Sequence, residues 1–432
     1  MIDSGGTRRE WMDSDSLSQT HFDKYSIFES HLRKLMEKST EDGLDVSKIQ
    51  NTAPFDVSYS ENLIHCDDFV NIKNRTYLAS GWTKAVYKGV YKGKNVAIKT
   101  VDVKGQDVST CMAKGHTFEF CYNKAAQKIV KEIIVLQALA NDNVIQVLGF
   151  CVPGIHSSLQ GVAMVTELGD SVDLIRLLQM SWEDRLRISL DLTRILNFMT
   201  TNPYGSMAMN DFRRQQFILV GGKLKLSDVD DVGFGDPSCN EDKDCDIVFS
   251  SANFSRRGVC RKYRCHGYNE KRNIFNGGRH FTTFLLPHGA PELLRPLVRT
   301  VVDAYSNVTM KPKQILAVLE RIVLLYSEGK YLNRTTKDNS IITYRILRHH
   351  DLPGIHDYRC RMSLSGFGCT LSVFDPREAQ DICDLDEECQ GFVMSKVKTW
   401  SGRILVHLKS GNSPYSLNNN TDLYLKQSRN KG

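Results

Sequence analysis

The segment MNDFRRQQFILVGGKLKLSDVDD, residues 209–231, contains the side chains best suited to chemistry. Asp211 lies on a loop before a predicted hairpin that turns at Gly221-Gly222, and Asp228 follows the second strand of that hairpin. Phosphoryl transfer from ATP needs one carboxylate that accepts the proton of the substrate hydroxyl and another that holds metal on the phosphates. The spacing therefore predicts Asp211 as a catalytic residue and Asp228 as a ligand of Mg²⁺ or Mn²⁺.

Two further oxygen donors accompany this pair. Gln216 stands five residues after Asp211, where phosphotransferases of this kind place a metal-binding asparagine. Its amide oxygen is on an arm one methylene longer, so coordination needs adjusted geometry. Asp230 replaces the glycine expected after Asp228-Val229 and either adds an oxygen ligand or projects into solvent. An extra acid near the metal suits Mn²⁺ as well as Mg²⁺.

A lysine that grips the phosphates and a glutamate that aims it are also present. The run VAIK ends at Lys99, and its alternating apolar residues predict a strand. Glu132, in the amphipathic segment KIVKEIIVLQAL, is the predicted partner, whereas the competing Glu119 lies outside the helical repeat. The long span between Lys99 and Glu132 holds Cys111 and Cys121, which suits a disulfide-tied insertion.

The loop that covers the phosphates is reduced. In ASGWTKAV only Gly81 remains of the three glycines expected, and Val86 stands where the valine after the loop belongs. Lys84 replaces the third glycine and either contacts phosphate or is a surface charge. Together with Lys99, Glu132 and Glu167, the last at the end of the strand GVAMVTEL, these residues form the predicted ATP-binding set.

The elements that must position these residues follow a recognisable order. A β-rich region precedes a helix, two buried strands, a larger helical region and a cysteine-containing tail. This order predicts an α+β, bilobal protein-kinase-like fold with disulfide-rich insertions and a cysteine-containing C-terminal extension. The predicted parts are a flexible stem at 1–60, the N-lobe at 61–165, the C-lobe at 166–335 with a cysteine-rich insertion at about 236–268, and a disulfide-containing extension at 336–432.

The extension has two interpretations. Its cysteines, ending with Cys389 and followed by Phe392, resemble a small disulfide-held binding module. Alternatively, the extension packs on the large lobe, and we favour this interpretation because NSIITYRILRHHDLPG is not a clear linker.

Cysteines and sequons indicate the compartment. The twelve cysteines include no Cys-x-x-Cys spacing, which disfavours structural zinc and favours disulfides. Several lie near one another in the sequence, such as Cys239 with Cys245 and Cys260 with Cys265, but the connectivity stays open. The opening MIDSGGTRRE is not an apolar leader, so no signal peptide is visible in this sequence. Five sequons are candidate N-glycosylation sites: Asn74, Asn253, Asn307, Asn333 and Asn419.

Charge and hydropathy exclude other classes. The net charge of +6 is mild and its basic residues are scattered among acids, so no nucleic-acid partner is expected. No apolar run is long enough to span a bilayer, and no transmembrane segment is predicted.

Six ordered segments extend the pattern over roughly residues 65–425: GWTKAVYKG, TELGDSVDLIRLLQMSWEDRLRISL, DFRRQQFILVGGKLKLSDVDD, GYNEKRN, DYRC and TWSGRILVHLKSG. Together they resemble the vertebrate lonesome kinase family of secreted tyrosine kinases. The resemblance implies ATP-dependent phosphorylation of tyrosines on secretory-pathway and extracellular proteins, with Golgi residence before secretion. It also implies that the Asp-x-Asp turn and the glutamine belong to the family rather than mark decay.

The residues leave two points open. Arg213, two residues after Asp211, stands where serine/threonine kinases usually carry lysine, so tyrosine specificity depends on the resemblance alone. Asn210 replaces the arginine that would receive an activation-loop phosphate, which disfavours that form of switching. The reduced glycine loop and Asp230 motivate the alternative, a pseudokinase acting as a secreted binding or scaffold protein.

Overall fold

The computed structural model describes residues 63–152, 161–249, 253–332, 342–360, 363–364 and 368–427. The predicted stem at 1–60 and the sequon at Asn333 lie outside the described residues. The chain divides into two compact units. Unit 1 comprises Met1–Val172 and Asp191–His280, and unit 2 comprises Asp173–Leu190 and Phe281–Gly432.

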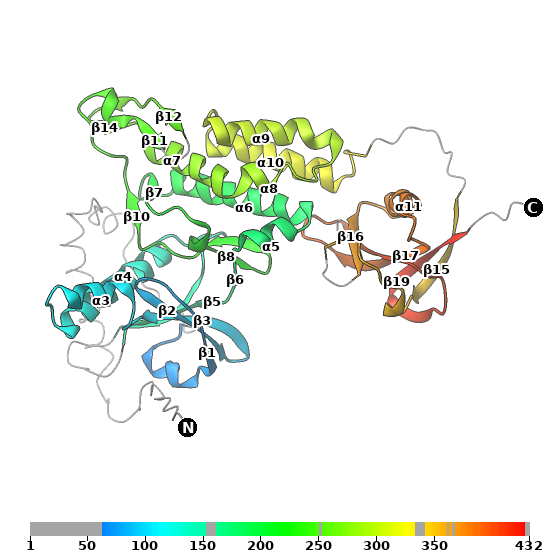
Figure 1. Ribbon diagram of the computed structural model, residues 1–432, viewed down its shortest axis with the longest axis horizontal. Helices are drawn as coiled ribbons and strands as arrows, with labels where there is room; N and C mark the ends of the chain where they lie inside the picture. Colours follow the sequence, from blue (N-terminus) through cyan, green and yellow to red (C-terminus); the bar gives the residue numbers. More distant parts are fainter. Residues whose placement is uncertain are drawn as a thin grey trace, which may run out of the picture. The chain divides into compact units, whose positions relative to one another are not determined.

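Unit 1 begins with an antiparallel five-stranded sheet in the order β1-β2-β3-β5-β4 (Figure 1). Its β2–β3 hairpin turns at Lys92 and Gly93, which both have positive φ, as a two-residue hairpin turn of this hand requires. The elements of this region are η1 (Cys66–Asn71), β1 (Lys73–Ser80), β2 (Lys84–Tyr91), β3 (Lys94–Val101), α3 (Gln106–Ala113), α4 (Phe118–Ala138), β4 (Val147–Cys151) and β5 (Ala163–Glu167).

Helix α4 carries the predicted glutamate. Thr117 caps its N-terminus by accepting a hydrogen bond from the backbone N–H of Phe120 at 3.3 Å. Ile129 and Ile133, one helical turn apart, are fully buried, and Glu132 shares their buried surroundings. Because α4 begins at Phe118, Glu119 does lie within the helix, contrary to the sequence interpretation, but in its exposed first turn.

The rest of unit 1 contains short strand pairs. The β8–β9 hairpin turns at Gly221 and Gly222, whose φ values of 57° and 77° confirm the predicted Gly-Gly turn. The elements are β6 (Asp170–Ser171), β7 (Met207–Met209), η2 (Arg214–Gln216), β8 (Phe217–Val220), β9 (Lys223–Leu226), β10 (Val232–Phe234), η3 (Asp242–Cys245), β11 (Ile247–Phe249), β12 (Phe254–Arg256), β13 (Cys260–Arg261), β14 (Arg264–Cys265), α7 (Tyr268–Gly277) and the π-helix η5 (Gly278–Thr282), whose last two residues belong to unit 2. Helix α6 (Trp182–Thr201) supplies residues to both units.

All twelve cysteines form six disulfides. In the cysteine-rich stretch the bonds are not between sequence neighbours, because the β13–β14 hairpin folds back on the preceding segment. The Cys239, Cys245 and Cys265 sulfurs lie together, but each belongs to a disulfide and none is a thiolate ligand for zinc. The six bonds are Cys66–Cys151, Cys111–Cys121, Cys239–Cys260, Cys245–Cys265, Cys360–Cys369 and Cys383–Cys389.

Unit 2 combines helices with the C-terminal sheet, which is antiparallel in the order β15-β19-β17-β18-β16 and carries α11 (Figure 1). Phe392, Val406 and Cys389 lie fully buried in the core of this extension. The elements are α5 (Leu174–Gln179), α8 (Thr283–Leu285), η6 (Glu292–Leu294), α9 (Arg295–Asn307), α10 (Pro312–Ser327), β15 (Thr343–Asp351), η7 (Gly354–His356), β16 (Cys369–Val373), α11 (Pro376–Leu385), β17 (Gly391–Lys398), β18 (Ile404–Lys409) and β19 (Ser416–Gln427).

Buried polar contacts connect the extension to helices α6 and α10. Arg403 donates to the carbonyl of Tyr326 at 3.2 Å and to both oxygens of Glu378 at 3.0 Å. The carboxylate of Glu183 accepts hydrogen bonds from the hydroxyls of Ser401, at 2.5 Å, and Ser372. The extension has its own apolar core and is also packed on these two helices.

These elements confirm the predicted α+β fold with several disulfides. Within the described residues, no helix has the length and apolar character needed to cross a membrane.

Candidate active site

Lys99 and Glu132 meet across the β3–α4 contact. The Lys99 ammonium donates to Glu132 Oε1 at 2.8 Å and to the carbonyl oxygen of Ser227 at 2.7 Å. Glu132 is fully buried, so its charge depends on cationic partners. The structure therefore brings the predicted pair together, with α3 and the Cys111–Cys121 disulfide in the intervening span.

Lys84 is not a surface charge, because its side chain is buried and held by ion pairs. Its side chain is 10% exposed, and its ammonium lies 2.7 Å from Glu132 Oε2, 2.8 Å from Asp228 Oδ1 and 3.1 Å from Asp230 Oδ2. Burial alone would lower the pKa of Lys84, but these three carboxylates outweigh burial and raise the pKa above its ordinary value. Lys84 is thus a cation at the centre of an acidic cluster, an arrangement that neither sequence interpretation described.

The hairpin places Asp228 beside Gln216. The backbone N–H groups of Ser227 and Asp228 both donate to the carbonyl of Gln216, at 2.8 and 3.2 Å. Burial opposes ionisation of Asp228, but the Lys84 and Lys99 ammonium groups outweigh it and lower its pKa to about 2. Asp228 is therefore a carboxylate ready to bind a cation.

Asp230 responds differently to the same surroundings. It does not project into solvent, because its side chain is only 15% exposed and contacts Lys84. Burial, assisted by the negative charges of Asp228 and Glu132, raises its pKa to about 6 despite the attraction of Lys84. The solvent-facing interpretation is therefore wrong, and metal ligation by Asp230 stays a prediction.

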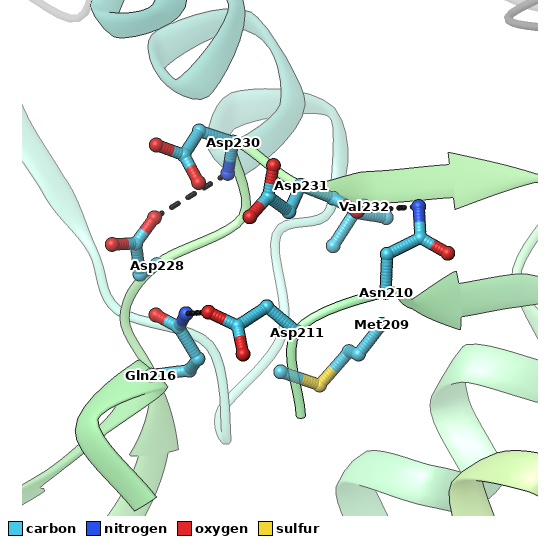
Figure 2. A pocket seen from close by; sticks show the side chains of 8 residues that line it. All are labelled: Met209, Asn210, Asp211, Gln216, Asp228, Asp230, Asp231 and Val232. Carbon is cyan, nitrogen blue, oxygen red and sulfur yellow. Dashed lines mark hydrogen bonds between the residues drawn. The ribbon is translucent and has the colours of Figure 1, made fainter. Parts of the chain in front are cut away.

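Asp211 lies across the same cavity from Asp228 (Figure 2). The amide Nε2 of Gln216 donates to Asp211 at 3.3 Å, so Oε1 is the Gln216 atom available to a metal, and Arg213 forms an ion pair with Asp211. The side chain of Asn210 donates to the carbonyl of Asp231 at 3.0 Å. Eight residues line the cavity: Met209, Asn210, Asp211, Gln216, Asp228, Asp230, Asp231 and Val232.

The remaining residues of the predicted ATP-binding set lie at the sheet. Gly81 is exposed at the β1–β2 turn, with open space where a side chain would be. Val86 is directly opposite Lys99 in the β2–β3 register. The carboxylate of Glu167 accepts from Lys225 at 2.6 Å and from the backbone N–H of Gln146 at 3.0 Å.

The sequence interpretation missed two members of the site. Asp231 lines the cavity, and Ser227 supplies the carbonyl that holds Lys99. The acidic run DVDD, residues 228–231, contains Asp231 and could have indicated it as a further acidic residue of the site. No pattern signalled the role of Ser227, because a backbone carbonyl carries no side-chain identity.

The donors fit a hard divalent cation. Asp228, Asp230 and Gln216 offer carboxylate and amide oxygens, the ligand types that Mg²⁺ and Mn²⁺ prefer. A cationic group already lies between Asp228 and Asp230 in the form of the Lys84 ammonium. The two carboxylates are therefore spaced to share one cation.

Four of the predicted glycosylation residues are exposed in the structure: Asn74, Asn253, Asn307 and Asn419. A glycan is bulky and lies at the surface, so these four positions have room for one in the folded protein.

A β3 lysine paired with a helix glutamate, together with a hairpin aspartate beside a loop aspartate, defines a protein-kinase-like domain. Comparison with known proteins agrees with this class. Residues 125–303 match the family described as the protein-kinase domain of FAM69. The chain is also 39% identical over 364 residues to the human protein named Extracellular tyrosine-protein kinase PKDCC, an alignment that covers 84% of this chain and 73% of that protein. The chain belongs to the PKDCC family, and the resemblance read from the sequence is confirmed.

Proposed function

We propose that this chain is an active secreted protein kinase that uses ATP and Mg²⁺ or Mn²⁺ to phosphorylate tyrosines of secretory-pathway and extracellular proteins. The observation that carries the proposal is the buried Lys99–Glu132 pair at 2.8 Å in the same structural unit as Asp211 and Asp228. Phosphoryl transfer depends on positioning and charge neutralisation more than on covalent chemistry, and these four residues are the parts it needs.

Each residue has a proposed role. Asp211 orients the substrate hydroxyl and accepts its proton, while Arg213 and Gln216 hold its carboxylate in place. Lys99, braced by Glu132, binds the α- and β-phosphates. A divalent ion, when bound, neutralises charge on the phosphates.

Asp228 is the principal residue proposed to hold that ion. Gln216 Oε1 and Asp230 are its proposed companions, and the low pKa of Asp228 keeps its carboxylate ionised at neutral pH.

The substrate class and compartment rest on other support. Tyrosine and the extracellular setting come from the name of the human relative. Six disulfides are typical of proteins from an oxidising compartment, and four exposed sequons are candidate sites for its glycosylation enzymes. We propose passage through the Golgi lumen before secretion, with protein substrates as partners.

A scaffold without phosphotransferase activity is the second candidate, and the Lys84 contacts favour it. An ammonium held by Asp228 and Asp230 occupies the place that the metal needs. Activity therefore decides between the two functions.

The test is phosphotransfer by the full chain, secreted from cells under an added leader and supplied with ATP, Mg²⁺ or Mn²⁺ and a generic protein substrate. Phosphosites are mapped by mass spectrometry. Asp228→Ala should lower transfer on the order of 10²-fold or more, the scale seen when a group that stabilises transition-state charge is lost. Asp142→Ala is the matched control, because the Asp142 side chain is 93% exposed.

Phosphotyrosine that disappears in Asp228→Ala supports the proposal. Phosphoserine in its place overturns the tyrosine assignment and keeps the kinase. Absence of transfer by a monodisperse wild-type chain that still binds ATP favours the scaffold.

A further inference from the structure

Lys84 faces the site because of the hairpin register. Val86 is opposite Lys99, and Lys84 is opposite Val101, so the two lysines lie on the same face of the sheet. Lys99 has one carboxylate partner and one carbonyl partner, whereas the ammonium of Lys84 is within 3.1 Å of three carboxylates. An ammonium has three N–H donors, so these contacts use all of them.

Glu132 is shared between the two lysines. Its Oε1 accepts from Lys99 at 2.8 Å and its Oε2 from Lys84 at 2.7 Å. The two Lys84 contacts that remain, to Asp228 and Asp230, involve the carboxylates proposed to bind metal. Lys84 therefore joins the lysine–glutamate pair to the candidate metal site.

The formal charges of these side chains give the net charge of the site that a metal ion would enter. Two lysines and three carboxylates give a formal charge of +2 − 3, or −1. With the Lys84 ammonium moved off Asp228 and Asp230 but still on Glu132, these two carboxylates carry −2, which one divalent cation balances. A divalent ion added while Lys84 stays in place would lie within contact distance of an ammonium of the same sign, which is unfavourable at low dielectric.

We propose that Lys84 is the resident cation of the metal site and that a divalent ion binds by displacing it from Asp228 and Asp230. The inference rests on the proposed function, since it takes these carboxylates as the metal site. The contact between Lys84 and Glu132 does not have to break, so the displaced ammonium keeps one buried partner. Lys84 is a positioning residue here: it holds the acidic side chains together without metal and sets how tightly metal binds.

The test is Mn²⁺ binding to the full chain without nucleotide, followed by the electron paramagnetic resonance signal of free Mn²⁺. Lys84→Met keeps the length and apolar stem of the side chain and removes its charge. The expected result is Mn²⁺ affinity at least about tenfold higher than in the wild type, because metal no longer competes with hydrogen bonds between charged groups. Lys94→Met is the matched control, since Lys94 is exposed on β3, and its affinity should equal that of the wild type.

Thermal unfolding in EDTA checks the fold of each variant. Without metal, Lys84→Met should have a lower melting temperature than the wild type. Saturating Mn²⁺ should raise its melting temperature by more than it raises that of the wild type, because the variant binds Mn²⁺ more tightly. If Lys84→Met does not fold, Lys84→Gln carries the same expectation, because its amide still donates to the carboxylates without a charge.

Unchanged or weaker Mn²⁺ affinity in a folded Lys84→Met variant overturns the inference. If Asp228→Asn abolishes Mn²⁺ binding in that case, the metal assignment still stands. No Mn²⁺ binding by any variant overturns the inference and the metal assignment together. Phosphotransfer by the wild type, measured separately, then decides whether the proposed function also fails.

Discussion

Arg403 is the most instructive residue to remove from unit 2. Its side chain is 1% exposed, yet it carries a full charge. The guanidinium donates to both oxygens of Glu378 and to two carbonyls, at distances of 2.8–3.2 Å, and lies 4.1 Å from the centre of the Tyr326 ring. Arg403→Met keeps most of the buried volume and removes all of these polar contacts.

The expected loss follows from the partner left behind. Glu378 is 9% exposed, and its contacts remaining among the described residues are with neutral donors, the backbone N–H of Phe374 and the hydroxyl of Tyr331. Breaking a buried ion pair by removing one partner costs about 3–5 kcal/mol. Arg403→Met should lower the free energy of unfolding by that amount, and Arg403→Lys by less because the charge remains.

A second substitution separates the charge from the packing. Glu378→Gln removes the negative charge and keeps an oxygen to accept from Phe374. The double variant Arg403→Met, Glu378→Gln should have a free energy of unfolding at least about 1.5 kcal/mol higher than Arg403→Met alone. This is the scale of an interaction energy between contacting residues.

The assay is urea unfolding followed by tryptophan fluorescence. Trp182 is 4% exposed and stacks edge-on against Tyr326 at 5.0 Å, so its emission reports on unfolding near Arg403. A loss below about 1 kcal/mol in Arg403→Met would refute the argument that Glu378 needs a cationic partner. A double variant as unstable as the single one would assign the loss to packing instead.

Two further predictions concern stability in unit 1. Replacing both members of the Cys66–Cys151 disulfide by alanine should lower the free energy of unfolding by about 4–5 kcal/mol, against about 2–3 kcal/mol for Cys111–Cys121. The difference arises because the two disulfides close loops of 85 and 10 residues. Equal losses of stability in urea unfolding would contradict this ranking. Asp230 should make the fold less stable as pH rises from 4 to 6. Its pKa is raised from 3.8 to about 6, so the folded state binds more protons than the unfolded state in that window. Relative to Asp230→Asn, the wild type should lose up to about 3 kcal/mol across that pH range, and parallel pH profiles of the two proteins would contradict the assignment.

The sequence predicted the local elements that carry the site. Alternating apolar residues before Lys99, helical spacing around Glu132 and the Gly221-Gly222 turn are short-range patterns, and each gave the element that the structure contains. The Lys99–Glu132 pair was also predictable, because its two elements adjoin in every fold of this class.

Disulfide pairing and the packing of the extension were not predictable to the same extent. Pairing depends on how the β13–β14 hairpin folds back, and the sequence alone assigned no connectivity to the twelve cysteines. The contacts of Arg403 join residues up to 77 positions apart, and no local pattern marks them. Long-range contacts of this kind depend on tertiary packing, which periodicity does not encode.

Lys84 is an intermediate case. Its inward orientation follows from the β2–β3 register, since a two-residue turn at Lys92 and Gly93 puts Lys84 on the face that carries Lys99. Its partners do not follow, because Asp228 and Asp230 lie 144 and 146 positions away.

Two of the departures from the kinase pattern, at Lys84 and Asp230, contact each other in the structure. Lys84 stands where a glycine of the phosphate loop is expected, and Asp230 stands where the glycine of the metal turn is expected. Taken separately, an extra lysine and an extra acid both suggest decay. The structure places Lys84 Nζ 3.1 Å from Asp230 Oδ2, with Asp228 bonded to the same ammonium. Because each charge supplies the partner that the other needs when buried, the two substitutions are mutually dependent. Lys84 and Asp230 are therefore two parts of one buried ionic cluster, and measured phosphotransfer decides whether that cluster belongs to a kinase or to a scaffold.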